Sequence, residues 1–411
     1  MQIVTTNRSR TTLQEIGHYR MVKTLKTIGK SFAICTMIYG VSDMHAQSAK
    51  TGSAKSYFTY VGTYTGPNSK GIYGFRFNTA DGTFTPTGVA AEVDQPSFVV
   101  TDPHHRFLYA VTEIGSGGKG EGFVSSFSID AKTGALTFLN KVPSLGGGPC
   151  HMVVDKTGRM LFVANYGTGS VVAFALKPDG SIGDKTAFDQ LSGSSVDARR
   201  QKGPHAHEVI LSSDNRFLFV PDLGVDHIKI YKVDAAARTF VPNNPAFVAV
   251  KPGLGPRHFA FGPGERFGYL LCEMGSSVVV FSYDKTKGSL NPIQTISNLP
   301  ADFTGEDNSA EIQVSASGRF VYASNRGHDS ITVYSVDPAK GTLSQVQIVP
   351  SGGKIPRNFV LDPSGKYLIA ANQKSDNMVI FDVDQKTGKL TPTGRETSVS
   401  SPVSIQFVPA P

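Results

Sequence analysis

The sequence contains no tryptophan and only three cysteines among its 411 residues. It also lacks any run of 18 or more apolar residues, so it offers no ordinary membrane-spanning helix. Charged residues make up 18% of the chain and aromatic residues 10%, a balance that excludes an intrinsically disordered protein. The 43 glycines and 24 prolines are too few for a collagen-like chain, but they suit a β protein with many turns.

Cysteine spacing gives no indication of a metal site. The sequence has no C-x-x-C pair and no histidine-rich stretch with the spacing of zinc ligands. We therefore expect no metal and no cofactor. We expect Cys150 and Cys272 to be buried as small apolar side chains, although a disulfide between them stays open.

The positive charge lies almost entirely in the first 55 residues. The formal net charge of the chain is +7. Residues 1–55 contain eight basic and two acidic residues, which leaves a net charge of +1 for residues 56–411. Nucleic-acid binding requires a basic face that neutralises phosphates. The nearly neutral remainder therefore predicts no nucleic-acid partner.

Residues 1–56 form a leader with the features of a secretory signal peptide. Three lysines precede a mostly apolar run at 31–41, Ala46 offers a small residue for cleavage, and residues 47–56 form a flexible spacer. We expect a periplasmic or secreted protein if the leader is cleaved, and a cytoplasmic protein otherwise. A leader helix that stays attached is the alternative, and a translation start at Met21 also stays open.

One sequence phrase recurs seven times after the leader. It combines a polar turn, an aromatic-rich strand, a turn of Gly, Asp or Ser, a second strand that ends in Asp, and a T-G-x-L turn. The leading aromatic or Met residues lie at positions 58, 107, 160, 217, 267, 320 and 367, so the gaps between copies are 47 to 57 residues. Alternating apolar and β-branched residues predict strands. Four short strands fit into each copy, which is the size of a propeller blade.

The two ends of the repeat array indicate that it closes into a ring. Other copies have a short strand before the aromatic strand, whereas the first copy opens directly at Tyr57. Residues 404–408 supply the missing strand, and closure of this kind removes exposed sheet edges. We predict an all-β, monomeric, seven-bladed β-propeller of four-stranded blades over residues 57–411, in which the C-terminal strand joins the N-terminal blade. An open sandwich or two smaller barrels are the alternatives.

The first strand of each propeller blade lines the central channel, so the residues just before these strands ring one opening. A proline recurs eleven residues before the leading position in four copies, which places the following side chains at equivalent points of the ring. A second tier of residues follows the aromatic strand. The two tiers break the repeat with a charged or imidazole group at His151, His205, His207, Arg257, His258, Glu273, Glu311, Arg326 and Arg357.

These residue types suit catalysis on an anionic substrate. Guanidinium groups capture carboxylate or phosphate. Imidazoles titrate near neutrality and serve as general bases, and a carboxylate beside an arginine stays ionised. Each candidate taken alone also has a structural interpretation, such as a histidine that completes hydrogen bonds at a strand start. Glu113 in the second tier has the interpretation of a turn cap. An arginine directly precedes the leading residue in five copies, and we interpret it as structural because it repeats: Arg106, Arg159, Arg216, Arg266 and Arg319.

The same segments resemble one known family. GPCHM (148–152), GPHAHEV (203–209), GPRHFAF (255–261), AEIQVSASGRFVYASNRGHDSI (310–331) and PRNFVLDPSGKYLIAANQKSDNMVIF (356–381) are similar to the lactonase family of seven-bladed propellers. That family contains propeller-type 6-phosphogluconolactonases and, more distantly, fungal muconate-lactonizing cycloisomerases. The resemblance covers about residues 57–411. It implies metal-independent hydrolysis of a sugar δ-lactone, typically 6-phospho-D-glucono-1,5-lactone in the pentose phosphate pathway.

The resemblance also implies roles for the candidate residues. Carried over by motif, the cycloisomerase branch implies a catalytic set of His205 or His207, Arg257, Glu273 and Arg326. We expect the others to bind substrate: His151, His258, Glu311 and Arg357. Arg257 and Arg326 would then hold the anion and polarise the lactone carbonyl. His207, or Glu273 acting with it, would take a proton from water.

Several other functions stay open. An exported enzyme would meet unphosphorylated sugar lactones rather than cytosolic phosphosugars, and a muconate-type cycloisomerase would use the same scaffold. A calcium-dependent gluconolactonase is a further option. A propeller also serves as a non-catalytic binding platform, which the fold alone does not exclude.

Overall fold

The computed structural model describes residues 55–118 and 120–411. The signal peptide, its cleavage site and most of the spacer that the sequence predicts lie outside the described residues. Within the described part of the chain, no helix is long and apolar enough to cross a membrane. Cys150 and Cys272 are both buried and both free, so the disulfide that stayed open does not form.

In the described residues, 28 strands form seven antiparallel sheets of four strands each. From the channel outward, the strands are β28 (Pro402–Pro409), β1 (Ser56–Thr63), β2 (Gly71–Asn78) and β3 (Thr83–Glu92) in blade 1; β4 (Val99–Thr101), β5 (Phe107–Thr112), β6 (Phe123–Ile129) and β7 (Leu136–Pro143) in blade 2; β8 (Pro149–Val154), β9 (Met160–Asn165), β10 (Ser170–Leu176) and β11 (Ile182–Gln190) in blade 3; β12 (Ile210–Leu211), β13 (Phe217–Asp222), β14 (His227–Asp234) and β15 (Thr239–Ala249) in blade 4; β16 (Pro256–Phe261), β17 (Phe267–Cys272), β18 (Ser277–Asp284) and β19 (Ser289–Ser297) in blade 5; β20 (Asn308–Val314), β21 (Phe320–Arg326), β22 (Ser330–Val336) and β23 (Leu343–Pro350) in blade 6; and β24 (Pro356–Leu361), β25 (Tyr367–Asn372), β26 (Asn377–Val383) and β27 (Leu390–Ser398) in blade 7.

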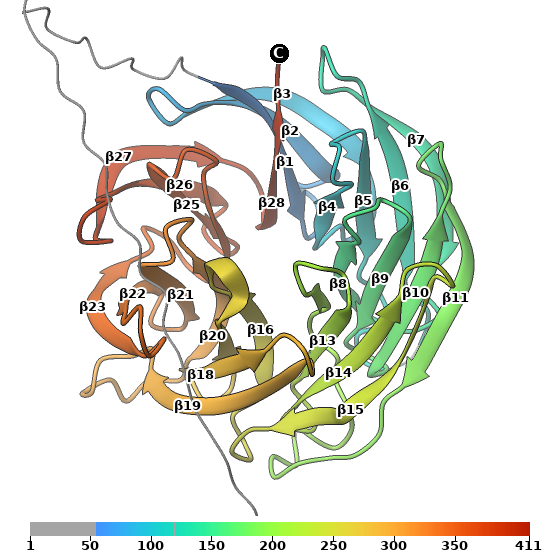
Figure 1. Cartoon of the computed structure of the whole chain (residues 1–411). Coiled ribbons are helices and arrows are strands. Elements are labelled where there is room, and N and C mark those ends of the chain that lie inside the picture. Colours follow the sequence, from blue (N-terminus) through green and yellow to red (C-terminus); the bar gives the residue numbers. More distant parts are fainter. Residues whose placement is uncertain (1–54, 119) are drawn as a thin grey trace, which may run out of the picture. The chain divides into compact units, whose positions relative to one another are not determined.

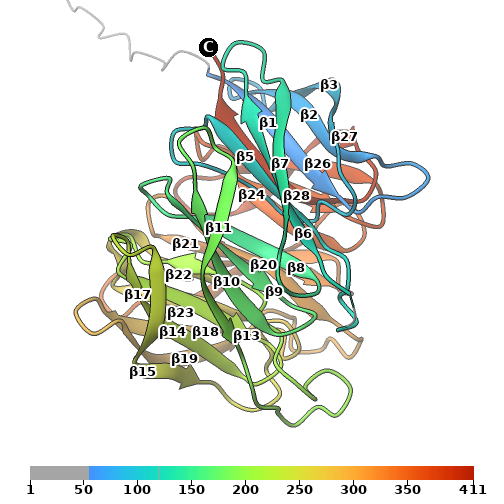
Figure 2. The same cartoon turned by 90° about the vertical axis from the view of Figure 1, so that its right-hand side faces the viewer.

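The seven sheets are arranged as blades around a central opening, and the colours in Figure 1 follow the chain once around the ring. Figure 2 shows the ring from its edge, where the outer strands β7, β11 and β15 face the viewer. A short 3-10 turn, η1 (Pro263–Glu265), lies between β16 and β17. The predicted all-β, seven-bladed propeller is therefore confirmed.

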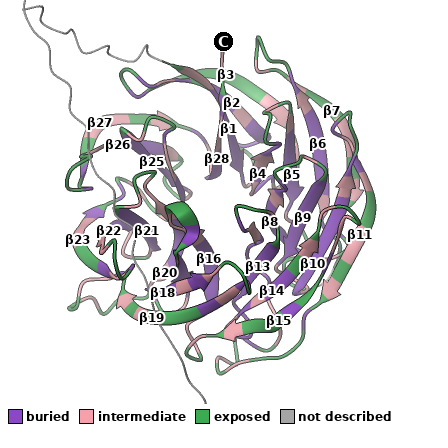
Figure 3. Cartoon of the chain, in the orientation of Figure 1, coloured by how far each residue is buried: buried purple, intermediate pink, exposed green. Residues whose placement is uncertain are grey.

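Burial follows the position of a strand within its blade. All six residues of β9 are buried, whereas most residues of the outer strand β3 are exposed (Figure 3). Neighbouring blades pack face to face, as where Phe162 of blade 3 and Tyr231 of blade 4 share one core cluster. Full burial of such a side chain contributes about 1.5–3 kcal/mol, so the alternating apolar pattern of the repeats holds the blades together.

The ring closes through strands from the two ends of the propeller. β28 pairs antiparallel with β1, with Tyr57 opposite Pro409 and Val61 opposite Ile405. The Ser404 hydroxyl then accepts a hydrogen bond from the Val99 amide of the next blade at 3.2 Å. The predicted closure by the C-terminal strand is therefore confirmed, and it leaves β1 paired on both sides.

The recurrent arginine stabilises contacts between blades, as its repetition predicts. The Arg319 guanidinium lies over the Phe320 ring and donates to the carbonyl of Gln385 in the next blade. Arg216 does the same with Phe217 and Lys285. These arginines follow the turn between the first and second strands, and the candidate residues lie at the other ends of those strands. The recurrent arginine thus belongs to the scaffold.

Candidate active site

The start of each inner strand and the end of the second strand lie at the same end of the channel, because the two strands pair antiparallel. Pro256 of β16 pairs with Cys272 of β17, and Glu273 follows directly. In blade 6, Asn308 of β20 pairs with Arg326 of β21. Side chains from both tiers of candidate positions therefore meet at one mouth of the propeller.

A cavity of about 420 Å³ lies at this mouth. Small-molecule sites typically have volumes of about 300 to 1,000 Å³, so this cavity is large enough for a sugar-sized ligand. Five candidate residues line it: His207, Arg257, Glu273, Arg326 and Arg357. The remaining lining residues are Tyr64, Glu113, Ser116, Cys150, Tyr166, Arg200, Asn308 and Ile355.

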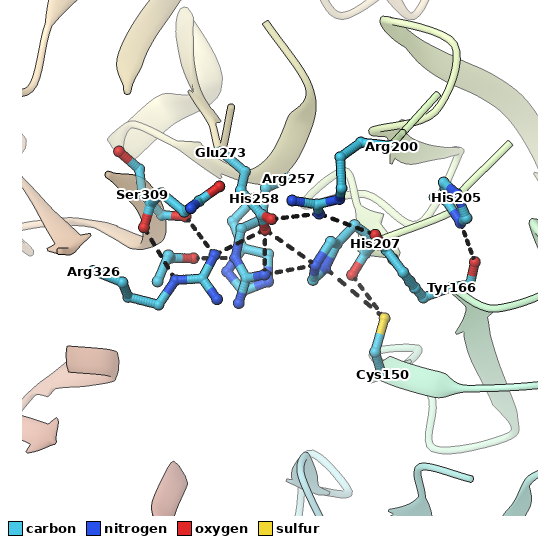
Figure 4. Close-up of polar contacts among 12 residues, drawn as sticks. Cys150, Tyr166, Arg200, His205, His207, Arg257, His258, Glu273, Ser309 and Arg326 are labelled. Carbon is cyan, nitrogen blue, oxygen red and sulfur yellow. Dashed lines mark hydrogen bonds and ion pairs between the residues drawn. The ribbon is translucent and has the colours of Figure 1, made fainter. Parts of the chain in front are cut away.

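Glu273 lies at the centre of one wall of the cavity. Its Oε2 atom is 2.7 Å from Nη1 of Arg257 and 2.9 Å from Nη2 of Arg326, and its Oε1 atom is 2.7 Å from Nη2 of Arg200. Figure 4 shows these contacts converging on the Glu273 carboxylate. We call these four residues, together with His207, the Glu273 cluster.

The cluster holds its carboxylate in the ionised form. Glu273 is 4% exposed, and burial alone would raise the pKa of its carboxyl group. The charges of Arg326 and Arg257, and then that of Arg200, instead hold this pKa well below its usual value. Backbone carbonyls fix the arginines: Arg257 donates from Nε to Ala310 at 2.7 Å, and Arg326 donates from Nε to Asn308 at 3.0 Å. The wall is therefore rigid and carries a net positive charge.

His207 is neutral within this cluster. Its Nε2 atom lies 2.6 Å from Nη1 of Arg257, and a guanidinium only donates, so we assign the ring proton to Nδ1. Burial, and then the charge of Arg257, lower the pKa of the His207 imidazole well below its usual value. The Cys150 thiol lies 3.3 Å from the His207 carbonyl oxygen and 3.8 Å from Nδ1. The free electron pair of this imidazole is thus directed at Arg257.

A second wall of the cavity is formed by Tyr64, Glu113 and Arg357. Tyr64 follows β1, Glu113 follows β5, and Arg357 is the second residue of β24. The Tyr64 hydroxyl donates to Oε2 of Glu113 at 2.8 Å, and the Arg357 guanidinium lies 5.2 Å from the centre of the Tyr64 ring. Burial raises the pKa of Tyr64, so this phenol stays protonated and acts as the donor. We call this set the Tyr64 group.

His205 does not line the cavity. Its Nδ1 atom lies 2.8 Å from the carbonyl oxygen of Tyr166, and the two rings stack with centroids 4.5 Å apart. Its backbone amide donates to the Asp222 carboxylate at 2.7 Å. Of the two histidines that the resemblance left as alternatives, the structure places His207 against the cavity and His205 behind Tyr166.

Three candidates that we expected to bind substrate lie deeper in the channel. Nδ1 of His258 is 3.4 Å from Oε2 of Glu311, and Nε2 of His151 is 3.6 Å from Oε1 of Glu208. His258 and Glu311 line a space of about 20 Å³ that shares residues with both the mouth cavity and a cavity of about 610 Å³ lined by His151 and Glu311. The structure therefore separates His151, His258 and Glu311 from the mouth cavity, where Arg357 lies.

Arg200 and Tyr166 are residues that the sequence interpretation missed. Arg200 lies in the connection between β11 and β12, its side chain is 36% exposed, and it also donates to the Tyr166 hydroxyl at 3.1 Å. The longest gap in the repeat array, 57 residues between positions 160 and 217, contains this connection. A connection that is longer than in the other repeats can carry an additional binding residue without disturbing a blade. The length of this gap was therefore the sequence feature that could have indicated Arg200.

The charges that line the cavity favour the binding of an anion. Its lining contains four guanidinium groups and two carboxylates, which give a net charge of +2 with His207 neutral. Among the residues that the structure describes, there is no group of three or more His, Cys, Asp or Glu side chains suited to a metal ion. Positive charge at this mouth is supplied by arginine, which recognises planar carboxylate and tetrahedral phosphate alike.

Comparison with known proteins agrees with this geometry. The chain is 36% identical over 352 residues to 6-phosphogluconolactonase of Bacillus subtilis, a match that covers 86% of this chain and 98% of the relative. A solved structure of a putative 6-phosphogluconolactonase from Bacteroides fragilis superimposes with a TM-score of 0.81 at 35% identity, covering 86% of this chain and 98% of that one. The periplasmic gluconolactonase of Pseudomonas aeruginosa also gives a TM-score of 0.81, at 36% identity, covering 87% and 100% of the two chains.

A family model matches the propeller along almost its whole length. It is described as lactonase, 7-bladed beta-propeller, and it covers residues 58–407. Those residues include both walls of the mouth cavity and most of the two strands that close the ring. The chain therefore belongs to the lactonase family of seven-bladed β-propellers.

Proposed function

We propose that this protein hydrolyses a sugar δ-lactone to the open hydroxy acid, and that its substrate is 6-phospho-D-glucono-1,5-lactone. The observation that carries the proposal is the convergence of Arg200, Arg257, Arg326 and Arg357 on a sugar-sized cavity with a net charge of +2. Family membership and the names of the relatives from Bacillus subtilis and Bacteroides fragilis support the same reaction. This reaction belongs to carbohydrate metabolism, in the pentose phosphate pathway.

The Glu273 cluster is suited to stabilise the tetrahedral intermediate. Within the described part of the chain, neither Nη2 of Arg257 nor Nη1 of Arg326 has a hydrogen-bond partner in the protein. Both nitrogens are therefore available to the lactone carbonyl oxygen, which becomes an oxyanion when water attacks. Donors that are fixed before the reaction contribute most to such stabilisation, and Glu273 and the backbone carbonyls fix these two.

The reaction requires one proton transfer from water. Water adds to C1, the bond between C1 and the ring oxygen breaks, and the ring oxygen becomes a hydroxyl group. The new carboxylic acid then ionises and releases one proton at neutral pH. General-base assistance to the attack is typically worth about 10² to 10⁴-fold.

An unphosphorylated sugar lactone is the second candidate substrate. The similarity to the periplasmic gluconolactonase of Pseudomonas aeruginosa favours it, as does the signal-peptide pattern of the leader. An exported enzyme would rarely meet a phosphosugar. The two candidates differ in one anionic group, so the rate with each lactone and the N-terminal residue of the mature protein separate them.

The test is hydrolysis of both gluconolactones, followed through proton release. We expect turnover that survives a chelator, a lower KM for the phosphorylated lactone, and a large loss of kcat/KM in Arg257→Ala. Equal KM values for the two lactones would favour the unphosphorylated substrate, and activity lost in chelator would favour a metal-dependent enzyme. No hydrolysis of either lactone above the spontaneous rate would refute the proposal in favour of a binding platform.

A further inference from the structure

The mouth cavity contains two carboxylates in contrasting environments. Both oxygens of Glu273 are occupied by guanidinium groups, at 2.7 Å for Oε1 and at 2.7 and 2.9 Å for Oε2. Glu113 receives one hydrogen bond at Oε2, from the neutral Tyr64 hydroxyl. Among the described residues its Oε1 atom has no hydrogen-bond partner, and no cation lies within ion-pair distance of its carboxylate. Glu113 thus keeps an unoccupied acceptor at the cavity.

The groups of the Glu273 cluster are poorly suited to accept a proton from water. The Nε2 electron pair of His207 already receives a hydrogen bond from Arg257 at 2.6 Å. A proton on that atom would face a guanidinium, and three guanidinium groups oppose protonation of Glu273. The cluster is therefore better suited to hold an anion than to act as a base.

Glu113 lies across the channel from the cluster. It belongs to blade 2 and Glu273 to blade 5, which is the largest separation that a ring of seven blades allows. Both nevertheless line the same cavity of about 420 Å³. Cys150 lines this cavity with both glutamates, and its thiol lies 3.3 Å from the His207 carbonyl oxygen. A lactone bound in this cavity would therefore lie between the Glu273 cluster and Glu113.

We propose that Glu113 is the catalytic base of the lactonase reaction and that Tyr64 positions it. This inference rests on the lactonase function proposed above. Oε1 of Glu113 takes a proton from water as the water oxygen bonds to C1, and the carbonyl electrons move onto the oxygen that Arg257 and Arg326 hold. When the C1–ring-oxygen bond breaks, the protonated Glu113 returns its proton to the ring oxygen. The carboxylate is then restored for the next turnover.

The Tyr64 group has the construction expected of a positioned base. The Glu113 amide donates to the Gln95 carbonyl at 3.0 Å, and the Tyr64 amide donates to the Ser401 carbonyl at 3.1 Å. These two bonds fix the backbone on both sides of the side-chain hydrogen bond. The Arg357 guanidinium packs on the Tyr64 ring, 5.2 Å from its centre, and so holds the phenol in place. The sequence interpretation of Glu113 as a turn cap does not account for this contact.

The central experiment is steady-state kinetics of Glu113→Gln on the lactone that the wild type hydrolyses fastest. Gln keeps an acceptor for Tyr64 but cannot take the proton. We expect kcat to fall about 10² to 10⁴-fold with KM changed less than about threefold, because substrate binding is left intact. Tyr64→Phe should lower kcat much less, by about tenfold. Glu92→Gln, which alters an exposed ion pair with Lys70, is the matched control and should leave both constants unchanged.

A second variant separates this assignment from the one that the resemblance implies. His207→Gln keeps an oxygen acceptor for Arg257 but removes the imidazole, and we expect a loss of kcat smaller than about tenfold. If Glu113→Gln retains more than a tenth of the wild-type kcat, or if His207→Gln loses activity while Glu113→Gln keeps it, Glu113 is not the base. A wild type inactive on every lactone would instead refute the proposed function. Matching thermal unfolding curves ensure that the variants are compared in the folded state.

Discussion

Replacing Glu273 with glutamine tests whether three arginines depend on one buried carboxylate. The Glu273 carboxylate contacts the buried guanidinium group of Arg257, that of Arg326, whose side chain is 12% exposed, and the partly exposed one of Arg200. Glutamine keeps the volume but removes the negative charge and turns an NH₂ group toward a guanidinium. Removing one partner of a buried ion pair typically costs about 3–5 kcal/mol, because the remaining charge is left uncompensated. Arg200 adds little to this cost, since solvent screens its charge.

The expected loss of stability corresponds to a measurable decrease in Tm. Unfolding entropy is roughly 2.1 cal/mol/K per residue, so for a propeller of roughly 350 residues a loss of about 3–5 kcal/mol lowers Tm by roughly 4 to 7 °C. Scanning calorimetry at pH 7 and low salt measures it. Sulfate or phosphate should stabilise Glu273→Gln more than the wild type, because an anion can replace the missing charge between the arginines.

The pH dependence provides an independent check. The pKa of Glu273 is lower in the folded protein than in the unfolded chain, so its stabilisation is complete above the unfolded value of 4.5 and is lost as pH falls through the folded value. The gap in Tm between wild type and Glu273→Gln should therefore narrow below about pH 4.5. Glu396→Gln, on an exposed part of β27, should shift Tm by less than 1 °C. A Glu273→Gln variant as stable as wild type at pH 7 would show that the cluster is not held by charge.

Three further perturbations follow from the same structure. Burial keeps His151, His207 and His258 neutral in the fold, and their pKa values are lowered, so the unfolded chain binds more protons and Tm should fall as pH drops below 6.5. In calorimetry His258→Gln should show a shallower slope, and an unchanged slope would contradict this account. Deleting residues 402–411 removes β28 and exposes the inner edge of β1, so size-exclusion chromatography should show aggregation; a monomeric truncated protein would refute the closure argument. Arg200→Ala should raise KM about fivefold, roughly 1 kcal/mol, with kcat nearly unchanged, because Arg200 lies at the exposed rim. A fall in kcat alone would contradict that position.

Much of the fold could be predicted from the sequence because the information is local and repeated. The leading aromatic positions 58 to 367 mark second strands, and six of the seven begin a strand while Phe58 lies within β1. The absence of a first strand before Tyr57 and the extra strand at 404–408 required a circular closure, which β28 and β1 make. Every blade has the same apolar alternation, so one weak copy is supported by the others.

The site was only partly predictable. Arg257, Glu273 and Arg326 stand out because they interrupt a repeat. The structure places the two guanidinium groups 2.7 and 2.9 Å from the Glu273 carboxylate. His151, His258 and Glu311 interrupt the repeat in the same way, yet they lie deeper in the channel. Interruption of a repeat does not fix the height of a residue in the channel, because successive residues of a strand lie about 3.3 Å apart along it. Arg257 lines the mouth cavity, whereas His258, the next residue of β16, does not.

The sequence alone determined the number of blades, the way in which the ring closes and the end of the channel where charged side chains gather. These properties depend on residue spacing, which is written directly in the chain. The tertiary structure decided which other side chains form hydrogen bonds or ion pairs with each of these charged side chains. Glu113 and Glu273 are both glutamates after a second strand, but one meets a phenol and the other meets three guanidinium groups from other segments of the chain. Partners so distant in sequence meet only after the ring has formed, and they decide which carboxylate oxygens stay open to a ligand.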